Sequence, residues 1–244
     1  MISSTTWTAR LPASVADALA PLLPRRCPIC GATLHERARV WCVACEAGMR
    51  VYTRPVCGEC RRFLDPGSDC PAGHVPLDPA RISALGAFDG AFGALVHALK
   101  YDGFRELARP LGDLLAERFA GSTPDVVVPV PTAPRKRRKR GFGHAEEIAR
   151  ACALRLGVAC LPDALRFTRR VADQTRLNAL QRQANMREAL TAREGVTLTG
   201  KSLLVVDDVF TTGAMMRESA RALKAAGAGA IQGAVVALNL NAQR

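Results

Sequence analysis

The fold of this 244-residue chain is decided by one stretch, Leu203-Leu204-Val205-Val206-Asp207-Asp208-Val209-Phe210-Thr211-Thr212-Gly213-Ala214-Met215-Met216. Its first four residues are apolar and predict a buried strand, which two adjacent carboxylates end. A Thr-Thr-Gly loop follows. The spacing of Met216, Ala220 and Leu223 then predicts a helix with one apolar face. The stretch therefore reads as strand, loop and helix in succession.

This order of elements predicts a sugar-phosphate site. Asp207 and Asp208 stand at the C-terminal tip of the strand, where open α/β sheets bind their ligands. The loop 211–213 points backbone N–H groups and hydroxyls at a helix N-terminus, which suits a phosphate. We expect the carboxylates to bind ribose hydroxyls and the loop to bind the 5′-phosphate.

A competing pattern precedes the strand. Gly195-Val196-Thr197-Leu198-Thr199-Gly200-Lys201-Ser202 matches the ATP-binding P-loop residue by residue. A P-loop, however, needs a helix directly after it, so that the helix N-terminus meets the phosphates. Here Lys201-Ser202 runs straight into the apolar strand, and the ATPase interpretation is disfavoured.

Composition limits the class of protein. The length allows one large domain or a domain with a small module, and 48% apolar residues suffice for a packed core. No apolar run approaches the ~18 residues of a membrane helix, and the N-terminus does not resemble a secretory signal, so we expect a soluble, cytoplasmic protein. The net charge is +12, and six of the positive charges form the string 135–140. Such a balance favours a polyanionic partner, although a solvated basic surface is the alternative.

Cysteines define a second region. Seven of the nine lie between Cys27 and Cys70, in Cys-x-x-Cys pairs that favour metal over disulfides in a cytosolic protein. Four tight turns supply eight ligands, enough for two closed structural Zn²⁺ sites. Pairing the turns sequentially gives the following two sets: Cys27, Cys30, Cys42 and Cys45; Cys57, Cys60, Cys70 and His74. A cross-braced pairing fits the spacing as well, so both remain open.

The rest of the chain predicts further elements of an α/β domain. Residues 126–131 predict a second buried strand, and the loop after it carries the basic string and Gly141-Phe142-Gly143 before a helix over 144–156. This basic loop is our candidate for gripping a pyrophosphate. The polar excursion 169–190 is typical of a mobile lid. We place an N-terminal segment at 1–24, a double zinc ribbon at 25–75 and the α/β domain at 82–244.

Taken together, these motifs resemble the ComF family, which includes ComFC-like and GntX-like proteins. The resemblance covers about 27–238 and rests on the following signatures: Leu99-Lys100-Tyr101; Val128-Pro129-Val130-Pro131; Arg140-Gly141-Phe142; Gln174 through Asn185-Met186-Arg187; Asp207-Asp208 with Thr211-Thr212-Gly213. It implies a phosphoribosyltransferase fold, a twisted and mainly parallel sheet with helices on both faces and a small hood, beside the zinc module.

The resemblance also implies ligands and roles. Phosphoribosyl pyrophosphate would bind with Mg²⁺, and two structural zinc ions would fold the ribbon. Asp207 and Asp208 would contact the ribose, and they are the catalytic candidates because they would stabilise positive charge on the sugar. The implied phosphate and pyrophosphate ligands are Thr211, Thr212, Gly213 and Ala214 for the 5′-phosphate, with Arg140 and Gly141 bordering the pyrophosphate.

Function follows from the resemblance only in outline. It implies handling of incoming single-stranded DNA, with proteins of the DNA-uptake machinery as further partners. The alternative is an active phosphoribosyltransferase in nucleobase or nucleotide salvage. Three positions depart from the family pattern: Met215 replaces a hydroxyl residue, Gly143-His144 replaces Asn-Gln, and His74 replaces a cysteine. The first two weigh against transferase activity more than against ligand binding.

Overall fold

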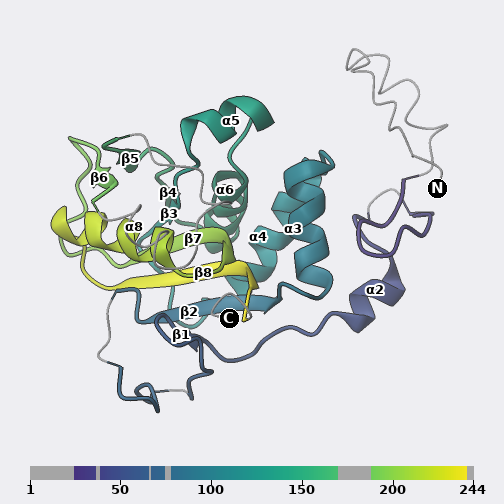
Figure 1. Ribbon diagram of the computed structural model, residues 1–244, viewed down its shortest axis with the longest axis horizontal. Coiled ribbons are helices and arrows are strands. Elements are labelled where there is room, and N and C mark those ends of the chain that lie inside the picture. The colour runs from purple at the N-terminus through teal and green to yellow at the C-terminus, as the bar shows by residue number, and fades with distance from the viewer. Residues whose placement is uncertain (1–24, 37–38, 66, 75–77, 170–187, 241–244) are drawn as a thin grey trace. The chain divides into compact units, whose positions relative to one another are not determined.

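A computed structural model describes residues 25–36, 39–65, 67–74, 78–169 and 188–240 (Figure 1). The predicted N-terminal segment and nearly all of the predicted lid lie outside these residues. The chain divides into two compact units, Met1–Gly48 and Met49–Arg244. The domain boundaries expected from sequence stay a prediction. In the part of the chain that the structure describes, no helix has the length and apolar character needed to cross a membrane.

The first unit is built around its cysteine turns. A short bridge pairs Arg26 with Thr33. The helix α2 (Val43–Gly48) contains Cys45, the last cysteine of this unit. The helix α2 has no buried residue, so we expect bound metal to contribute to the stability of the described part of this unit.

The second unit contains a six-stranded sheet in the order β1-β2-β8-β7-β3-β4. All pairs are parallel except β1 with β2, which confirms the mainly parallel sheet expected from sequence. The strands are β1 (Val56–Cys57), β2 (Arg81–Ala87), β3 (Val126–Pro129), β4 (Ala159–Cys160), β7 (Leu203–Phe210) and β8 (Ile231–Leu238).

Helices cover both faces of this sheet, as expected. The helical segments are α3 (Ala91–Tyr101), the 3₁₀ turn η1 (Arg105–Leu107), α4 (Ala108–Glu117), α5 (Pro134–Arg140), α6 (His144–Leu156) and α8 (Ala214–Ala225). The crossovers β2→β3 and β3→β4 progress in one direction across the sheet, and β7→β8 progresses in the other. Because parallel crossovers are right-handed, α8 lies on the face opposite α4 and α6 (Figure 1).

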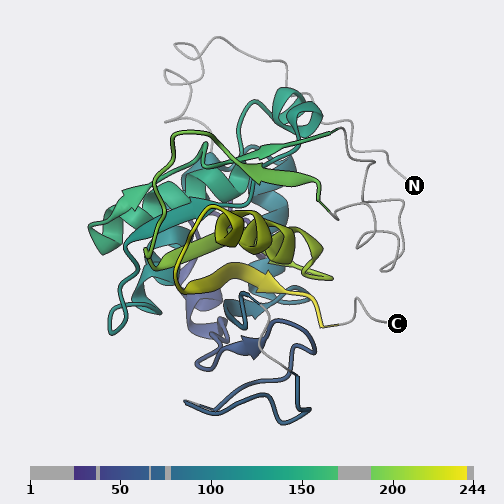
Figure 2. The ribbon, with the colours of Figure 1, turned by 90° about the vertical axis from the view of Figure 1, so that its left-hand side faces the viewer.

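A small antiparallel sheet completes the unit. It pairs β5 (Leu165–Phe167) with β6 (Leu190–Ala192) and lies beside α8 (Figure 2). Residues 165–167 and 190–192 flank the predicted lid, so we call this sheet the hood. The apolar face of α8 packs into the main core, where Met216, Ala220 and Leu223 are buried as the spacing predicts.

Two local expectations were wrong. The strand β7 does not end at the carboxylates but continues to Phe210, because β8 runs alongside it and pairs Phe210 with Leu238. The basic string is not a loop but the helix α5. Pro134 stands at the start of this helix, and Gly141 ends it in the left-handed conformation with φ 83°. These two termini define a helix despite its adjacent like charges.

Candidate functional site

The topology of the sheet locates a binding edge. From β7 the chain crosses to β8 on one side, whereas from β3 it crosses to β4 on the other, so β3 and β7 flank the switch point. Ligands of open α/β sheets bind outside the carboxyl ends of such strands. The two ends are joined by a hydrogen bond of 2.8 Å from Val130 N to Val206 O. Asp207 therefore begins the part of β7 that extends past β3.

Asp207 and Asp208 occupy this edge and point to different faces, because side chains alternate along a strand. Lys100, in the last turn of α3, reaches Asp208 with its Nζ 2.7 Å from Oδ1, and both side chains are largely buried. Asp207 instead accepts a hydrogen bond of 2.8 Å from the backbone N–H of Asp208. Among the described residues, Asp208 thus pairs with a cation and Asp207 forms no ion pair.

The second carboxylate has unusual protonation. Burial of Asp207, followed by the neighbouring charge of Asp208, raises its pKa to about 8, although Lys100 acts in the opposite direction. The raised pKa favours the protonated form of Asp207, which can donate a hydrogen bond. A pair with one neutral and one charged carboxyl suits vicinal hydroxyl groups, which both donate and accept.

The loop 211–213 has the geometry of an anion cradle, and we call it the phosphate loop. Gly213 has φ 74° and is the N-cap of α8. A Cβ at Gly213 would lie 2.6 Å from the Phe210 ring and 2.8 Å from Arg217 Nη1, so only glycine fits. Within the described residues, the amides of Thr212 and Gly213 donate to no protein group. Both are available for a ligand at the helix N-terminus.

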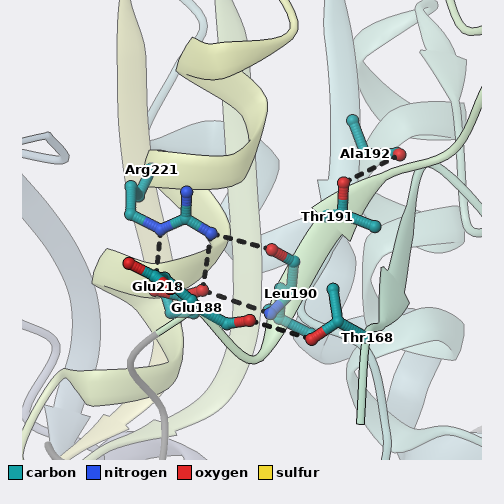
Figure 3. Close-up of polar contacts among 7 residues, drawn as sticks. All are labelled: Thr168, Glu188, Leu190, Thr191, Ala192, Glu218 and Arg221. Atoms are coloured by element: carbon teal, nitrogen blue, oxygen red, sulfur yellow. Dashed lines mark hydrogen bonds and ion pairs between the residues drawn. The ribbon is translucent and has the colours of Figure 1, made fainter.

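The helix α8 also holds the hood, as Figure 3 shows. Glu218, which is buried, accepts a hydrogen bond of 3.1 Å from Leu190 N and forms an ion pair of 2.8 Å with Arg221. Arg221 in turn donates to Leu190 O at 2.8 Å. Glu188 and Thr168 are joined nearby, with Thr168 Oγ1 donating to Glu188 O at 2.8 Å. One helix therefore fixes both the phosphate loop and the start of β6.

The end of β3 leads into a hollow of about 320 Å³ between the loop after β3 and the hood. Its polar lining includes Arg137 and Glu146, which form an ion pair of 3.0 Å. The guanidinium of Arg105 lies over the Phe142 ring, 4.4 Å from its centroid, and pairs with Glu147 at 2.8 Å. These contacts fix the turn between α5 and α6.

The predicted pyrophosphate ligands are only partly located. Gly141 is the C-cap of α5, while the side chain of Arg140 lies outside what the structure describes. Among the described residues, no hydrogen bond or ion pair joins α5 to Asp207 or Asp208. The pyrophosphate role of Arg140 and Gly141 stays a prediction.

The structure brings together the sequential cysteine sets. We call Cys27, Cys30, Cys42 and Cys45 the first cluster, and Cys57, Cys60, Cys70 and His74 the second. In each cluster the ligand atoms all lie within 4.8 Å of one another. Sulfur and nitrogen donors at such spacing fit tetrahedral Zn²⁺, so the two clusters are consistent with two structural zinc ions.

One thiol of each cluster has a lowered pKa, whereas burial raises the pKa of Cys45 and of Cys60. Burial alone would raise the pKa of Cys27, but amide N–H groups from Cys42, Cys30 and Ile29 outweigh it and lower that pKa to about 6. In the second cluster His74, whose Nδ1 lies 3.3 Å from the sulfur, is the main cause that lowers the pKa of Cys70 to about 6. Thiolates are the form that binds zinc.

Three residues of the site were missed as ligand-site candidates by sequence reasoning. Lys100 appears in a family signature, but no local pattern assigns it to Asp208, which lies 108 residues away. Arg61 and Arg217 hold the carbonyl oxygens of the phosphate loop. For Arg61 a signal existed, because it occupies the turn position that glycine takes after Cys30.

Comparison with known proteins agrees with this geometry. The double zinc ribbon domain family matches residues 18–73, and the phosphoribosyl transferase domain family matches residues 101–244. A protein named DNA utilization protein YhgH from Salmonella typhi is 29% identical over 78% of this chain and 93% of its own. The protein of the same name from Escherichia coli K12 is 28% identical, over 86% and 95% of the two chains.

A third relative carries a different name. Competence protein F of Haemophilus influenzae is 24% identical over 85% of this chain and 94% of its own. The phosphoribosyl transferase match covers more than half of the chain and includes β3, β7, the phosphate loop and α8. The chain therefore belongs to the phosphoribosyl transferase domain family, and it joins that domain to a double zinc ribbon as ComF-like proteins do.

Proposed function

We propose that the protein binds phosphoribosyl pyrophosphate with Mg²⁺ at the carboxyl end of β7 and acts in the handling of incoming single-stranded DNA. One observation carries the ligand: a carboxyl pair and a loop with two available amides follow each other on one strand and helix at the switch point. In this arrangement Asp207 and Asp208 bind the ribose hydroxyls, and Thr211, Thr212, Gly213 and Ala214 bind the 5′-phosphate. Arg140 and Gly141 border the pyrophosphate.

The charges of the site suit such a ligand. Bound Mg²⁺ supplies positive charge that the pyrophosphate requires. Lys100 pairs with Asp208, and a ribose hydroxyl would compete for the same carboxylate. If the sugar reacts, positive charge develops at its C1 atom, and the nearby carboxyl pair is placed to stabilise that charge.

Titration calorimetry with phosphoribosyl pyrophosphate and Mg²⁺ tests the ligand. We expect binding by the wild-type protein and a loss of at least about tenfold in Asp207→Ala, since one hydrogen bond to a ribose hydroxyl and its local backbone contact are removed. Asp65→Ala is the matched control, because Asp65 is an exposed carboxylate that pairs with Arg54. Absence of binding by the wild type, or equal binding by Asp207→Ala, would contradict the proposal.

The nucleic-acid part of the proposal is supported by charge and by the names of relatives. Arg135 and Arg138 are exposed on α5, near the end of β3. Two relatives are named for DNA utilization and competence. Aromatic residues are only 5% of the chain, which favours backbone tracking over base stacking.

A salt titration of single-stranded DNA binding tests this part. Each lost phosphate contact should reduce the slope of log affinity against log salt by about 0.7. The variant Arg135→Gln/Arg138→Gln should therefore show a slope smaller by about 1.4. Arg155→Gln/Lys201→Gln removes two exposed charges at the opposite edge of the sheet and should keep the wild-type slope. Equal slopes in the two variants would reject α5 as the DNA surface.

Transferase activity in nucleobase or nucleotide salvage is the alternative function. The family match and the carboxyl pair favour it, while Met215 in place of a hydroxyl residue weighs against it. Release of pyrophosphate from phosphoribosyl pyrophosphate, measured with a panel of bases, separates the two. Turnover with any base would favour salvage, and no turnover despite binding would favour the ligand-binding role.

A further inference from the structure

Two turns of the chain have the same backbone but different residues at one position. After Cys30 the turn is closed by a hydrogen bond of 2.8 Å from Gly31 N to Cys27 O, and after Cys60 by one of 2.9 Å from Arg61 N to Cys57 O. Both closing residues have positive φ, 76° at Gly31 and 61° at Arg61. Glycine adopts this conformation freely, whereas arginine is strained in it. An arginine at this strained position therefore needs a compensating contact made by its side chain.

The side chain of Arg61 makes such contacts. It is only 4% exposed, and among the described residues no carboxylate lies within ion-pair distance of it. Its Nη1 donates to Thr211 O at 2.8 Å and to Asn239 O at 2.7 Å. The guanidinium thus connects the zinc turn to the phosphate loop and to the end of β8, across 150 residues of sequence.

A second arginine makes the connection from the other side. Arg217, in the first turn of α8, donates through Nη2 to Thr212 O at 2.8 Å and through Nη1 to Gly58 O at 3.3 Å. It also approaches Glu59 at 3.7 Å. Gly58 itself is pressed against the chain, since a Cβ there would lie 2.4 Å from Pro79 O. The 57–61 turn is therefore fixed to the sheet and cannot shift independently of the loop.

These contacts determine where the loop amides point. In a trans peptide unit the C=O and the following N–H point in opposite directions. Arg61 holds the carbonyl of Thr211, so the amide of Thr212 points away from it. Arg217 holds the carbonyl of Thr212 and orients the amide of Gly213 in the same way. Neither of these two amides donates to a group among the described residues.

We propose that Arg61 is a positioning residue of the phosphate loop, and that the second cluster, through Arg61 and the Gly58–Arg217 contact, makes ribose-phosphate affinity depend on its bound metal. The first cluster has no such role. The inference rests on the proposed ribose-phosphate site and adds to it the element that preorganises the loop.

Titration with ribose 5-phosphate and, separately, with inorganic pyrophosphate tests the role of Arg61. Arg61→Gly restores the residue that the 27–31 turn uses and should weaken ribose 5-phosphate binding by roughly tenfold, since a charged donor to two carbonyls is lost. Pyrophosphate affinity and zinc content should stay at wild-type values. Arg62→Gly is the matched control, because Arg62 is the exposed neighbour of the same charge.

The outcomes distinguish the positioning role of Arg61 from the ribose-phosphate site itself. If the wild type binds no ribose 5-phosphate, the proposed function falls and the inference with it. If the wild type binds and Arg61→Gly binds equally well, only the inference falls. The inference also falls if Arg62→Gly loses as much affinity as Arg61→Gly, or if Arg61→Gly loses both ligands together.

Hydrogen exchange gives a test in which Arg61 itself is left unchanged. With ribose 5-phosphate bound, which would protect the Thr212 and Gly213 amides, removing zinc with a chelator should speed exchange of these two amides more than exchange of the β8 amides. Repeating the experiment on Cys30→Ser, which loses a ligand of the first cluster only, should show slow exchange at the loop before chelation. Unchanged exchange on zinc removal, or equal acceleration along β8, would overturn the proposal.

Discussion

The 27–31 turn and the 57–61 turn fold alike, yet they serve different surroundings. Gly31 is exposed and a side chain there would meet nothing within 4 Å, whereas Arg61 is buried and reaches the phosphate loop. Cys57 lies in β1, which pairs with β2 and so makes the second cluster continuous with the main sheet. By our proposal the 57–61 turn supports a distant loop, through Arg61, the Gly58–Arg217 contact and the pairing of β1 with β2.

Removing one cysteine ligand from each cluster is the strongest test of the difference between the two turns. Cys60→Ser and Cys30→Ser change the same position of their turns. We expect Cys60→Ser to destabilise the larger unit by several kcal/mol, about 10 °C in melting temperature, because the second cluster is part of its sheet. Cys30→Ser should leave this transition unchanged. Calorimetric melting with zinc quantification measures both, and equal shifts would show that the clusters are equivalent.

The carboxyl pair sharpens the comparison, because no hydrogen bond or ion pair joins it to either cysteine turn in the part of the chain that the structure describes. Asp207 has a pKa raised to about 8 by burial and by Asp208, so the folded protein binds a proton that the unfolded chain loses above about pH 4. The stability that this proton contributes is fully present below pH 4 and is lost as pH rises to 8. We expect the unfolding free energy of the wild type to fall by up to about 4 kcal/mol, relative to Asp207→Asn, between pH 5 and 9.

Denaturant titrations over this pH range measure the difference. The same pH dependence should persist in Arg61→Gly, because Arg61 and Asp207 share no contact among the described residues and their effects should add. An altered pH dependence in Arg61→Gly would show that the second cluster reaches the carboxyl pair as well as the loop. A flat wild-type curve would contradict the protonated state of Asp207.

The contacts by which α8 holds the hood give the next prediction. Glu218 is buried and binds both Arg221 and the backbone of Leu190, so Glu218→Ala should cost about 3 kcal/mol in unfolding free energy. Glu194→Ala is the matched control, since Glu194 is exposed and its pair with Arg166 should contribute under about 1 kcal/mol. Equal losses in the two variants, measured by chemical denaturation, would argue against Glu218 as the anchor of the hood.

The sequence was most informative where structure is local. The strand, loop and helix from Leu203 to Leu223 follow from apolar spacing and from Gly213, and the cysteine turns follow from their spacing. All of these depend on contacts within a few residues. Periodicity and turn chemistry were therefore sufficient to predict them.

Contacts between distant segments could not be predicted. The extension of β7 to Phe210 depends on its pairing with β8. Lys100 meets Asp208 only because the fold brings the end of α3 beside the end of β7. The helix α5 forms because Pro134 and Gly141 define its ends, a local signal that the run of charge concealed. Arg61 was identifiable as an arginine in a glycine position, but its partner Thr211 was not.

The smallest expected effect is the most direct test of the comparison between the two turns. Gly31→Arg places in the first turn the residue that the second turn carries. Because φ is 76° and a Cβ there would meet nothing within 4 Å, we expect a loss of about 1 kcal/mol from backbone strain. Gly31→Ala should cost the same amount, since the strain comes from Cβ. Denaturant unfolding, monitored by the release of zinc, measures both.

A Gly31→Arg protein clearly more stable than Gly31→Ala would mean that an arginine at this turn finds favourable contacts locally. The strain at Arg61 would then need no distant loop to explain it.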